Sequence, residues 1–229
     1  MLVGAHQPNF LPWAGYFGKI LACDAFVIMD DAQIPRGRSY ASRTKIRQGA
    51  EERWLSLPIF KNDGQTYRDA KVADLKMYGQ HLKVFSHTYG KAPFYDETMA
   101  LLQPIYERQP EFLIDFNLAV IEAVLKAVGH NAELAMSSDL GSALASSEWL
   151  SALTKHAGGD AYLSGPGGAS YIDPAVFEAA GVRLQFGKYT PVSYAVPKFD
   201  FMPGLSIVDA LFVAGADAMG DVLRYDLID

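Results

Sequence analysis

The sequence predicts an α/β fold: a mostly parallel sheet with flanking helices, Rossmann-like or nucleotidylyltransferase-like, with a helical insertion in the middle. Strand patterns alternate with helical patterns at both ends of the chain, and residues from about 77 to 130 have helical spacing. Such alternation favours a parallel sheet, because parallel neighbours need a crossover connection. We therefore predict a single α/β domain over residues 1–229.

The first elements have the pattern of a parallel crossover unit. The short apolar run "MLVGAH" predicts a strand that ends at the Pro-containing loop "QPNFLP". "WAGYFGKILAC" has the apolar spacing of a helix, although its glycines weaken that pattern. "AFVIMDD" then predicts a second buried strand, so strand, loop, helix and strand follow within about 30 residues.

A basic, polar connection leads into the alternating strand "RWLSLPIF", and the helical middle follows it. Helices are predicted in "YGQHLKVFSHTYG", "YDETMALLQPIYERQ" and "PEFLIDFNLAVIEAVLKAVG". Pro110 suits the first turn of the third helix, and Gly129 lies just past its end.

The C-terminal part returns to alternating elements. "SSEWLSALTKHAGGD" predicts a helix with Ser146 or Ser147 as N-cap, and "AYLSGPGGASYI" predicts a strand that runs into a glycine-rich loop. "DPAVFEAAG" predicts a helix capped by Asp173, "VRLQFGKY" a strand, and "LSIVDALFVAG" the last helix. Ser206 and Asp209 have the spacing of a capping box for that helix.

The charge, the N-terminal pattern and the cysteine and histidine content argue against several classes of function. The net charge of -6 and the pI near 5.3 argue against broad electrostatic binding to nucleic acid or to a membrane surface. The N-terminus has no secretory pattern, so a cytoplasmic protein is expected. The single cysteine, Cys23, excludes an internal disulfide framework. His81 and His87 are six residues apart, which is wrong for a helical metal pair, so no metal site is assigned.

His6, Gln7 and Asn9 follow or lie close to the end of the first predicted strand. Open α/β sheets bind ligands at the carboxyl ends of their strands, beside helix N-termini. His6 is therefore a candidate general base or a hydrogen-bond donor to phosphate, with Gln7 and Asn9 as candidate substrate contacts. The alternative interpretation is a capping histidine in a Pro-rich turn.

Asp30 and Asp31 end the second predicted strand. Side chains alternate along a strand, so at most one of the two is expected to face the cleft that holds His6. A carboxylate there could hold a metal, a ribose hydroxyl or an amine, and an N-cap or turn role is an equal alternative. Both aspartates are candidate catalytic residues.

Five cations fall within twelve residues of an otherwise acidic protein: Arg36, Arg38, Arg43, Lys45 and Arg47. Arginine binds phosphate in bidentate fashion, so Arg36, Arg38 and Arg43, with Tyr40 among them, are candidate contacts to a phosphate-bearing substrate. A tRNA acceptor end is also chemically compatible with this segment. The alternative is a solvated loop of ion pairs.

The loop "SGPGG" joins a predicted strand to a helix. Glycines allow a backbone to approach a ligand closely, and successive N–H groups can form an anion nest. The loop is neither a Walker loop nor G-x-G-x-x-G, and a plain tight connection explains it almost as well. Ser164, Gly165, Gly167 and Gly168 are its candidate substrate contacts.

Several segments together resemble the WbqC-like family: "HQPNFLPWAGYFGKI", "FVIMDDAQIPRGRSYASRTKI", "WLSLPI", "SHTYGKAPFY", "SSEWLSALTKHAGGDAYLSGPGGASYID" and "FMPGLSIVDALF". The resemblance covers nearly the whole chain and implies a protein of bacterial surface-polysaccharide or modified-sugar biosynthesis. Residues 40–43 depart from the family's aromatic-x-Asn-Arg pattern. Ala195 and Val196 stand where the family tends to carry a glutamine. Both departures bear on the identity of the acceptor more than on the fold.

The family setting and the candidate residues together suggest a transferase that moves an acyl or aminoacyl group onto a nucleotide-linked, amino-substituted sugar. His6 would act as base on the amine, and the expected partners are a phosphate-bearing small molecule and an acyl or aminoacyl donor. The order of strand, His-Pro loop and helix is also similar to nucleotidylyltransferases of the His-x-Gly-His kind, although the second histidine is missing. That alternative would require Mg²⁺ and a nucleoside triphosphate, whereas no cofactor is assigned to the first. A non-catalytic sugar-nucleotide-binding module is a third possibility.

Overall fold

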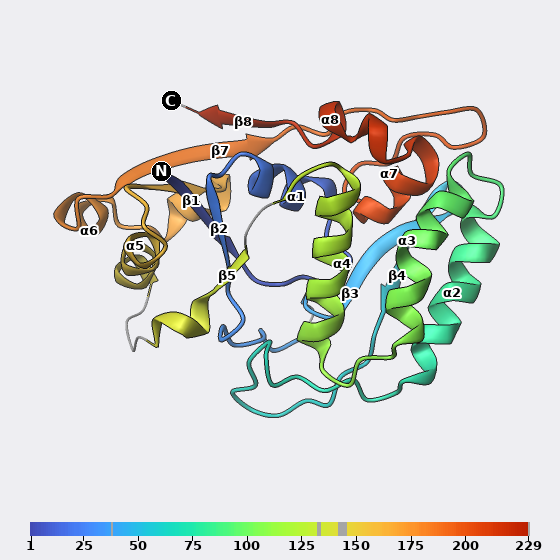
Figure 1. The fold of residues 1–229 in the computed structure, drawn as a ribbon, viewed down its shortest axis with the longest axis horizontal. Coiled ribbons are helices and arrows are strands. Elements are labelled where there is room, and N and C mark those ends of the chain that lie inside the picture. Colours follow the sequence, from blue (N-terminus) through green and yellow to red (C-terminus); the bar gives the residue numbers. More distant parts are fainter. Residues whose placement is uncertain (38, 132–133, 142–145, 229) are drawn as a thin grey trace.

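The computed structural model describes residues 1–37, 39–131, 134–141 and 146–228. Within these ranges a six-stranded sheet has the order β5-β2-β1-β6-β7-β8, and only the β7–β8 pair is antiparallel (Figure 1). The strands are β1 (Leu2–His6), β2 (Ala25–Ile28), β5 (Leu134–Met136), β6 (Ala161–Ser164), β7 (Arg183–Tyr189) and β8 (Tyr225–Ile228). The prediction of an α/β fold with a mostly parallel sheet is confirmed.

Helices pack around the sheet, and most residues in the middle of the sequence are also helical. They are α1 (Ala14–Leu21), α2 (Lys76–Tyr89), α3 (Tyr95–Glu107), α4 (Leu113–Ala127), α5 (Ser146–His156), α6 (Pro174–Ala179), α7 (Ile207–Ala214) and α8 (Met219–Val222). Short 3-10 turns are η1 (Ser137–Leu140), η2 (Pro166–Ser170) and η3 (Ala216–Ala218). Two predicted caps are present, since the Asp173 and Ser206 side chains accept from the N–H groups of Ala175 and Val208. The predicted cap at Ser146 or Ser147 is wrong, because both residues lie inside α5 and the Ser147 hydroxyl accepts from the Asp173 N–H.

Two strands outside the sheet form an antiparallel hairpin, β3 (Arg43–Gln48) with β4 (Glu51–Ser56). The sequence predicted β4, but it did not predict β3, β5 or β8. β3 was not recognised because Arg43, Lys45 and Arg47 alternate with Thr44 and Ile46, so only two of its residues show the pattern of a buried strand face. The basic segment is therefore partly a strand, and pairing with β4 fixes the direction of its arginines.

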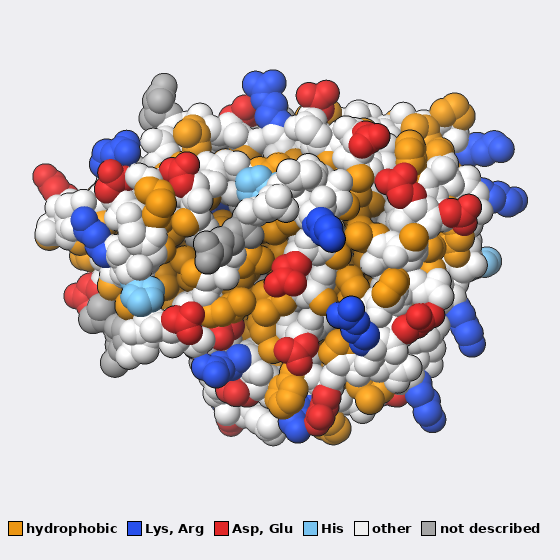
Figure 2. Space-filling view, in the orientation of Figure 1, with side chains coloured by type: hydrophobic (Ala, Val, Ile, Leu, Met, Phe, Trp, Pro, Cys, Tyr) orange, Lys and Arg blue, Asp and Glu red, His pale blue; other side chains and the backbone are white. Residues whose placement is uncertain are grey.

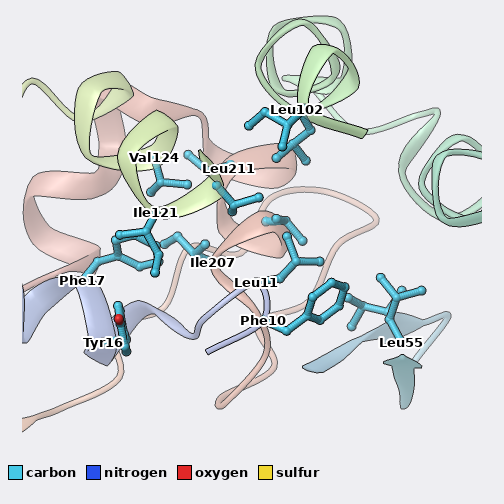
Figure 3. Close-up of a cluster of buried hydrophobic side chains, with 14 of the residues drawn as sticks. Phe10, Leu11, Tyr16, Phe17, Leu55, Leu102, Ile121, Val124, Ile207 and Leu211 are labelled. Carbon is cyan, nitrogen blue, oxygen red and sulfur yellow. The ribbon is translucent and has the colours of Figure 1, made fainter. Parts of the chain in front are cut away.

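Two hydrophobic clusters lie on opposite faces of the sheet. Successive residues of β2 divide between them, because Phe26 and Ile28 belong to the larger cluster and Val27 to the smaller. The smaller cluster packs under α5 and α6, and the larger joins α1 to the helical middle. Figure 3 shows Phe17 of α1 beside Ile121 of α4 in that larger cluster.

A buried ion pair joins the hairpin to α7. Arg47 donates from Nε to Asp209 Oδ1 at 2.7 Å and from an Nη to Oδ2 at 2.9 Å. The hydroxyls of Tyr89 and Tyr194 also donate to this carboxylate, at 2.9 and 3.0 Å. The capping-box interpretation of Asp209 is therefore wrong, because its carboxylate serves a buried guanidinium from a distant strand. Ser206 alone caps α7.

The surface carries charges of both signs. Figure 2 shows Lys, Arg, Asp and Glu side chains interspersed around one face, with hydrophobic side chains gathered across its middle. The charge on this face is therefore mixed. In the part of the chain that the structure describes, no helix combines the length and the apolar character needed to cross a membrane.

Strand order places a topological switch point beside β1. From β1 the chain adds β2 and then β5 on one side, whereas β6 pairs with the other side of β1. The carboxyl ends of β1 and β6 therefore lie side by side, at His6 and Ser164. A crevice at such a point is the usual ligand site of an open α/β sheet.

Candidate active site

A cavity of about 680 Å³ opens at the carboxyl ends of β1 and β6. We call it the switch-point cavity. Its lining includes His6 at the end of β1 with Gln7 after it, and Ser164 at the end of β6 with the loop that continues to Gly168. Helix α1 contributes further lining residues, and aromatic rings complete the walls: Trp13, Tyr16, Trp149, Tyr162, Tyr171, Tyr189 and Tyr225. Flat rings of this kind suit a nucleobase or a sugar ring.

The structure brings six of the sequence-predicted site residues to this one cavity: His6, Gln7, Ser164, Gly165, Gly167 and Gly168. The first two come from one end of the sequence, and the other four lie about 160 residues further on. Asn9 is buried in the loop after β1 and lines neither this cavity nor the one described next.

The arginines line a different hollow, of about 500 Å³, which we call the arginine hollow. Arg36 forms an exposed ion pair with Asp63 at 3.0 Å, and the Arg43 guanidinium lies 4.0 Å from the centre of the Trp54 ring. Arg38 falls outside the described residues. Two other cations of the segment are already paired, Lys45 with Glu52 and Arg47 with Asp209.

A row of aromatic contacts runs from the switch-point cavity to the arginine hollow. Trp13 lines the switch-point cavity, and its ring centre is 6.1 Å from that of Tyr40. The neighbours of Tyr40 in sequence, Ser39 and Ala41, line the arginine hollow, and Tyr40 itself is 43% exposed. Its ring centre also lies 5.6 Å from that of Trp54, over which Arg43 lies, so Tyr40 connects the two hollows through ring contacts.

Asp30 and Asp31 line neither hollow. Asp30 Oδ1 accepts from Ser137 Oγ at 3.2 Å and from the Ser138 N–H at 3.0 Å, and Asp31 contacts the same hydroxyl. Both carboxylates thus tie the end of β2 to the turn after β5. The expectation that His6, an aspartate and the arginines meet around one hollow is not met by the described residues. The aspartates bind to Ser137 and Ser138 of η1, and Arg36 and Arg43 line a different hollow from His6.

The contacts of His6 determine which ring nitrogen carries its proton. Nδ1 lies 3.1 Å from the Gln7 carbonyl oxygen, which can only accept, so Nδ1 carries the hydrogen and Nε2 keeps its lone pair. Trp13 and Tyr16 hold the ring edge-on, at 5.7 and 5.0 Å between centres. Burial, aided by the Lys19 ammonium, lowers the pKa of His6 to about 4, so the imidazole is neutral at pH 7.

Lys19 is a site residue that the sequence analysis missed. It lies in the last turn of the otherwise apolar helix α1, lines the switch-point cavity, and is 7% exposed. Burial lowers its pKa to about 8, which leaves it mostly protonated at pH 7. A single charge within the buried run "AGYFGKIL" was the available signal, since lysine is rarely buried without a partner.

The lining of the switch-point cavity does not fit a protein-held Mg²⁺. Magnesium sites use one or two carboxylates together with substrate phosphates. None of the described residues that line this cavity is Asp or Glu, and Lys19 places a positive charge there. Throughout the described ranges, no group of three or more His, Cys, Asp or Glu side chains is arranged to hold a metal ion.

Gly168 makes the closest backbone approach in the glycine loop. A Cβ at this position would overlap the Ser164 Oγ and come within 3.0 Å of Ile172 Cδ1, whereas a Cβ on Gly167 would meet nothing within 4 Å. We expect Gly168→Ala to lower the free energy of unfolding by about 1–3 kcal/mol, because Ser164 is buried and cannot move freely. Urea denaturation measures the loss, and Gly167→Ala is the matched control. Equal stability of the two variants would contradict this packing.

Comparison with known proteins gives two matches. The model of a family described as "WbqC-like protein family" matches residues 7–221. A protein of Mycobacterium tuberculosis, described as uncharacterized, is 31% identical over 223 residues, which cover 96% of this chain and 96% of that protein. The family model spans the loop after β1, the hairpin and the glycine loop.

Proposed function

The chain belongs to the WbqC-like protein family, and we propose that it is a transferase acting on a nucleotide-linked amino sugar. The reaction proposed is transfer of an acyl or aminoacyl group to the sugar amine, in surface-polysaccharide or modified-sugar biosynthesis. The observation that carries the proposal is the switch-point cavity, where a neutral histidine, a glycine loop and aromatic walls surround one space.

The cavity supports this ligand class by its chemistry. Aromatic rings can stack on a base or a sugar, and the Gly165 to Gly168 backbone lies where a phosphate-bearing group can approach closely. The absence of acidic side chains from the described lining favours a ligand that brings negative charge. Its volume of about 680 Å³ lies within the usual 300–1,000 Å³ of small-molecule sites.

His6 would act as the base of the transfer. As the amine nitrogen attacks the acyl carbon, its N–H becomes acidic, and the free Nε2 of His6 accepts that proton. The bond from the acyl carbon to the oxygen or sulfur of the donor then breaks, and the imidazolium returns the proton to this leaving atom. The hydrogen bond from Nδ1 to the Gln7 carbonyl would hold the ring in place through both steps.

The arginine hollow would take the phosphate-bearing end of the donor. Arg36 and Arg43 line it, and ring contacts of Tyr40 lead from Trp54, beside Arg43, to Trp13 of the switch-point cavity. A donor held there by its phosphates could extend its acyl end past Tyr40 and Trp13 toward His6. An acyl carrier with a phosphate-rich tail or an aminoacylated tRNA end would supply such a group.

Mass spectrometry tests the reaction directly. The protein is incubated with uridine- and thymidine-diphosphate amino sugars and with acyl-coenzyme A or aminoacyl-tRNA. The expected product is a nucleotide sugar heavier by one acyl or aminoacyl group, with release of the free carrier. Pyrophosphate release from a nucleoside triphosphate would instead support the nucleotidylyltransferase alternative. Ligand-induced thermal stabilisation without any product would support a non-catalytic binding module.

A further inference from the structure

The ammonium of Lys19 has unused hydrogen-bonding capacity inside the switch-point cavity. Within the described part of the chain, its Nζ donates one hydrogen bond, to the Ala5 carbonyl at 2.9 Å. An ammonium has three donors, so two remain for other partners. The Tyr162 ring, whose centre lies 5.7 Å from Nζ, offers a weak cation–π contact.

The charge of Lys19 also lacks a carboxylate partner among the described residues. No described Asp or Glu lines the cavity, and no ion pair within the described ranges includes Lys19. A buried lysine without an acidic partner carries a cost in stability, because its charge has left water without full compensation. Such a cost is typical of a residue kept for binding.

Tight packing of α1 fixes the position of this lysine. A Cβ on Gly18 would overlap the Leu223 carbonyl, and a Cβ on Gly15 would lie 2.7 Å from Tyr189 Cγ. These glycines let the helix lie directly against β7 and the segment before β8. Lys19 therefore presents its charge from a rigid element, at a defined place beside the ends of β1 and β6.

We propose that Lys19 binds the diphosphate of the substrate in the switch-point cavity, as the central counter-charge of the site. This inference rests on the proposed function. For the ligand in the switch-point cavity, it assigns phosphate binding to Lys19 of α1 rather than to the arginines. The two free donors of Nζ would bind phosphate oxygens, while the glycine loop approaches from the β6 side.

Binding of an anion at Lys19 would also act on His6. The Lys19 charge is one of the causes that lower the pKa of His6. A phosphate beside the ammonium offsets that charge, so the pKa of His6 would rise toward its ordinary value when substrate binds. The imidazole would then be a better proton acceptor in the complex than in the free protein.

The test uses inorganic pyrophosphate, uridine diphosphate and uridine with the full-length protein, at matched ionic strength. Both anions should raise the melting temperature of the wild type, and uridine should do so much less. Lys19→Met keeps the length of the apolar stem but removes the charge, and it should weaken anion binding by about 10- to 100-fold. Lys71→Met, at an exposed ion pair with Glu111, is the matched control and should bind like the wild type.

The outcomes separate the two proposals. Equal anion affinity in Lys19→Met and the wild type, or no anion binding by the wild type, would overturn the assignment of Lys19. Binding of pyrophosphate through Lys19 with no further gain from any nucleotide would support Lys19 and count against a nucleotide-linked substrate. If Lys19→Met does not fold, nitrogen-15 lysine spectra of the wild type decide, because the resonance of this buried ammonium should shift on adding pyrophosphate.

Discussion

Replacing Asp209 with alanine is expected to lower the free energy of unfolding by about 3–5 kcal/mol. The Asp209 side chain has no exposed area and that of Arg47 is 5% exposed, so the variant would leave a guanidinium buried without its carboxylate. The hydroxyls of Tyr89 and Tyr194 would lose their acceptor at the same time. Urea denaturation of the variant and the wild type measures the difference.

A control and a double variant make this prediction specific. Asp226→Ala removes a carboxylate from an exposed pair with Arg224, at 3.0 Å, and should cost less than about 1 kcal/mol. The double variant Arg47→Met/Asp209→Leu removes both charges, so it should be more stable than Asp209→Ala alone. A loss of under about 1 kcal/mol in Asp209→Ala would show that the pair does not hold the hairpin on α7.

Replacing His6 with alanine is expected to reduce the turnover of the transfer by about 10²-fold or more. The reason is the loss of Nε2, the unprotonated nitrogen that the hydrogen bond to the Gln7 carbonyl leaves available. Steady-state rates of product formation measure the effect. His87→Ala, an exposed histidine on α2, is the matched control and should keep wild-type turnover.

The pH dependence of kcat/KM gives a second readout for His6. In the free protein the pKa of His6 is lowered to about 4, so its neutral form persists well below the ordinary value of 6.5. The contribution of His6 should therefore remain constant from pH 7 down to about 5 and fall only as the pH approaches 4. Turnover of His6→Ala within twofold of the wild type would remove this residue from the mechanism.

Most of the sheet and the helices were predictable, because the spacing of apolar residues and the capping residues identify them in the local sequence. β1, β2, β6 and β7 are apolar or alternating runs, and each of the helices α2 to α7 has a recognisable apolar face, start or stop in the sequence. β3, β5 and β8 were not predictable. β5 has three residues, β8 is a four-residue edge strand, and the β3 pattern is masked by cations.

The candidate site was predictable only where strand ends define it. His6 and Ser164 could be placed at a sheet edge from the sequence, since each ends a strand that runs into a loop. The sequence did not distinguish the different roles of the cations in the basic segment. Its members look alike in sequence, yet Arg47 is a buried ion-pair partner, Arg43 lies over Trp54 and Arg36 is exposed.

The fold class, the strand and helix pattern around His6 and the family resemblance can all be read from the sequence, because each depends on the order of residues along the chain. The three-dimensional structure was needed to show that β6 returns beside β1, that Asp30 and Asp31 bind a serine, and that Lys19 lines the cavity. Strand order and burial depend on contacts between distant segments. Spacing along a single chain does not specify those contacts.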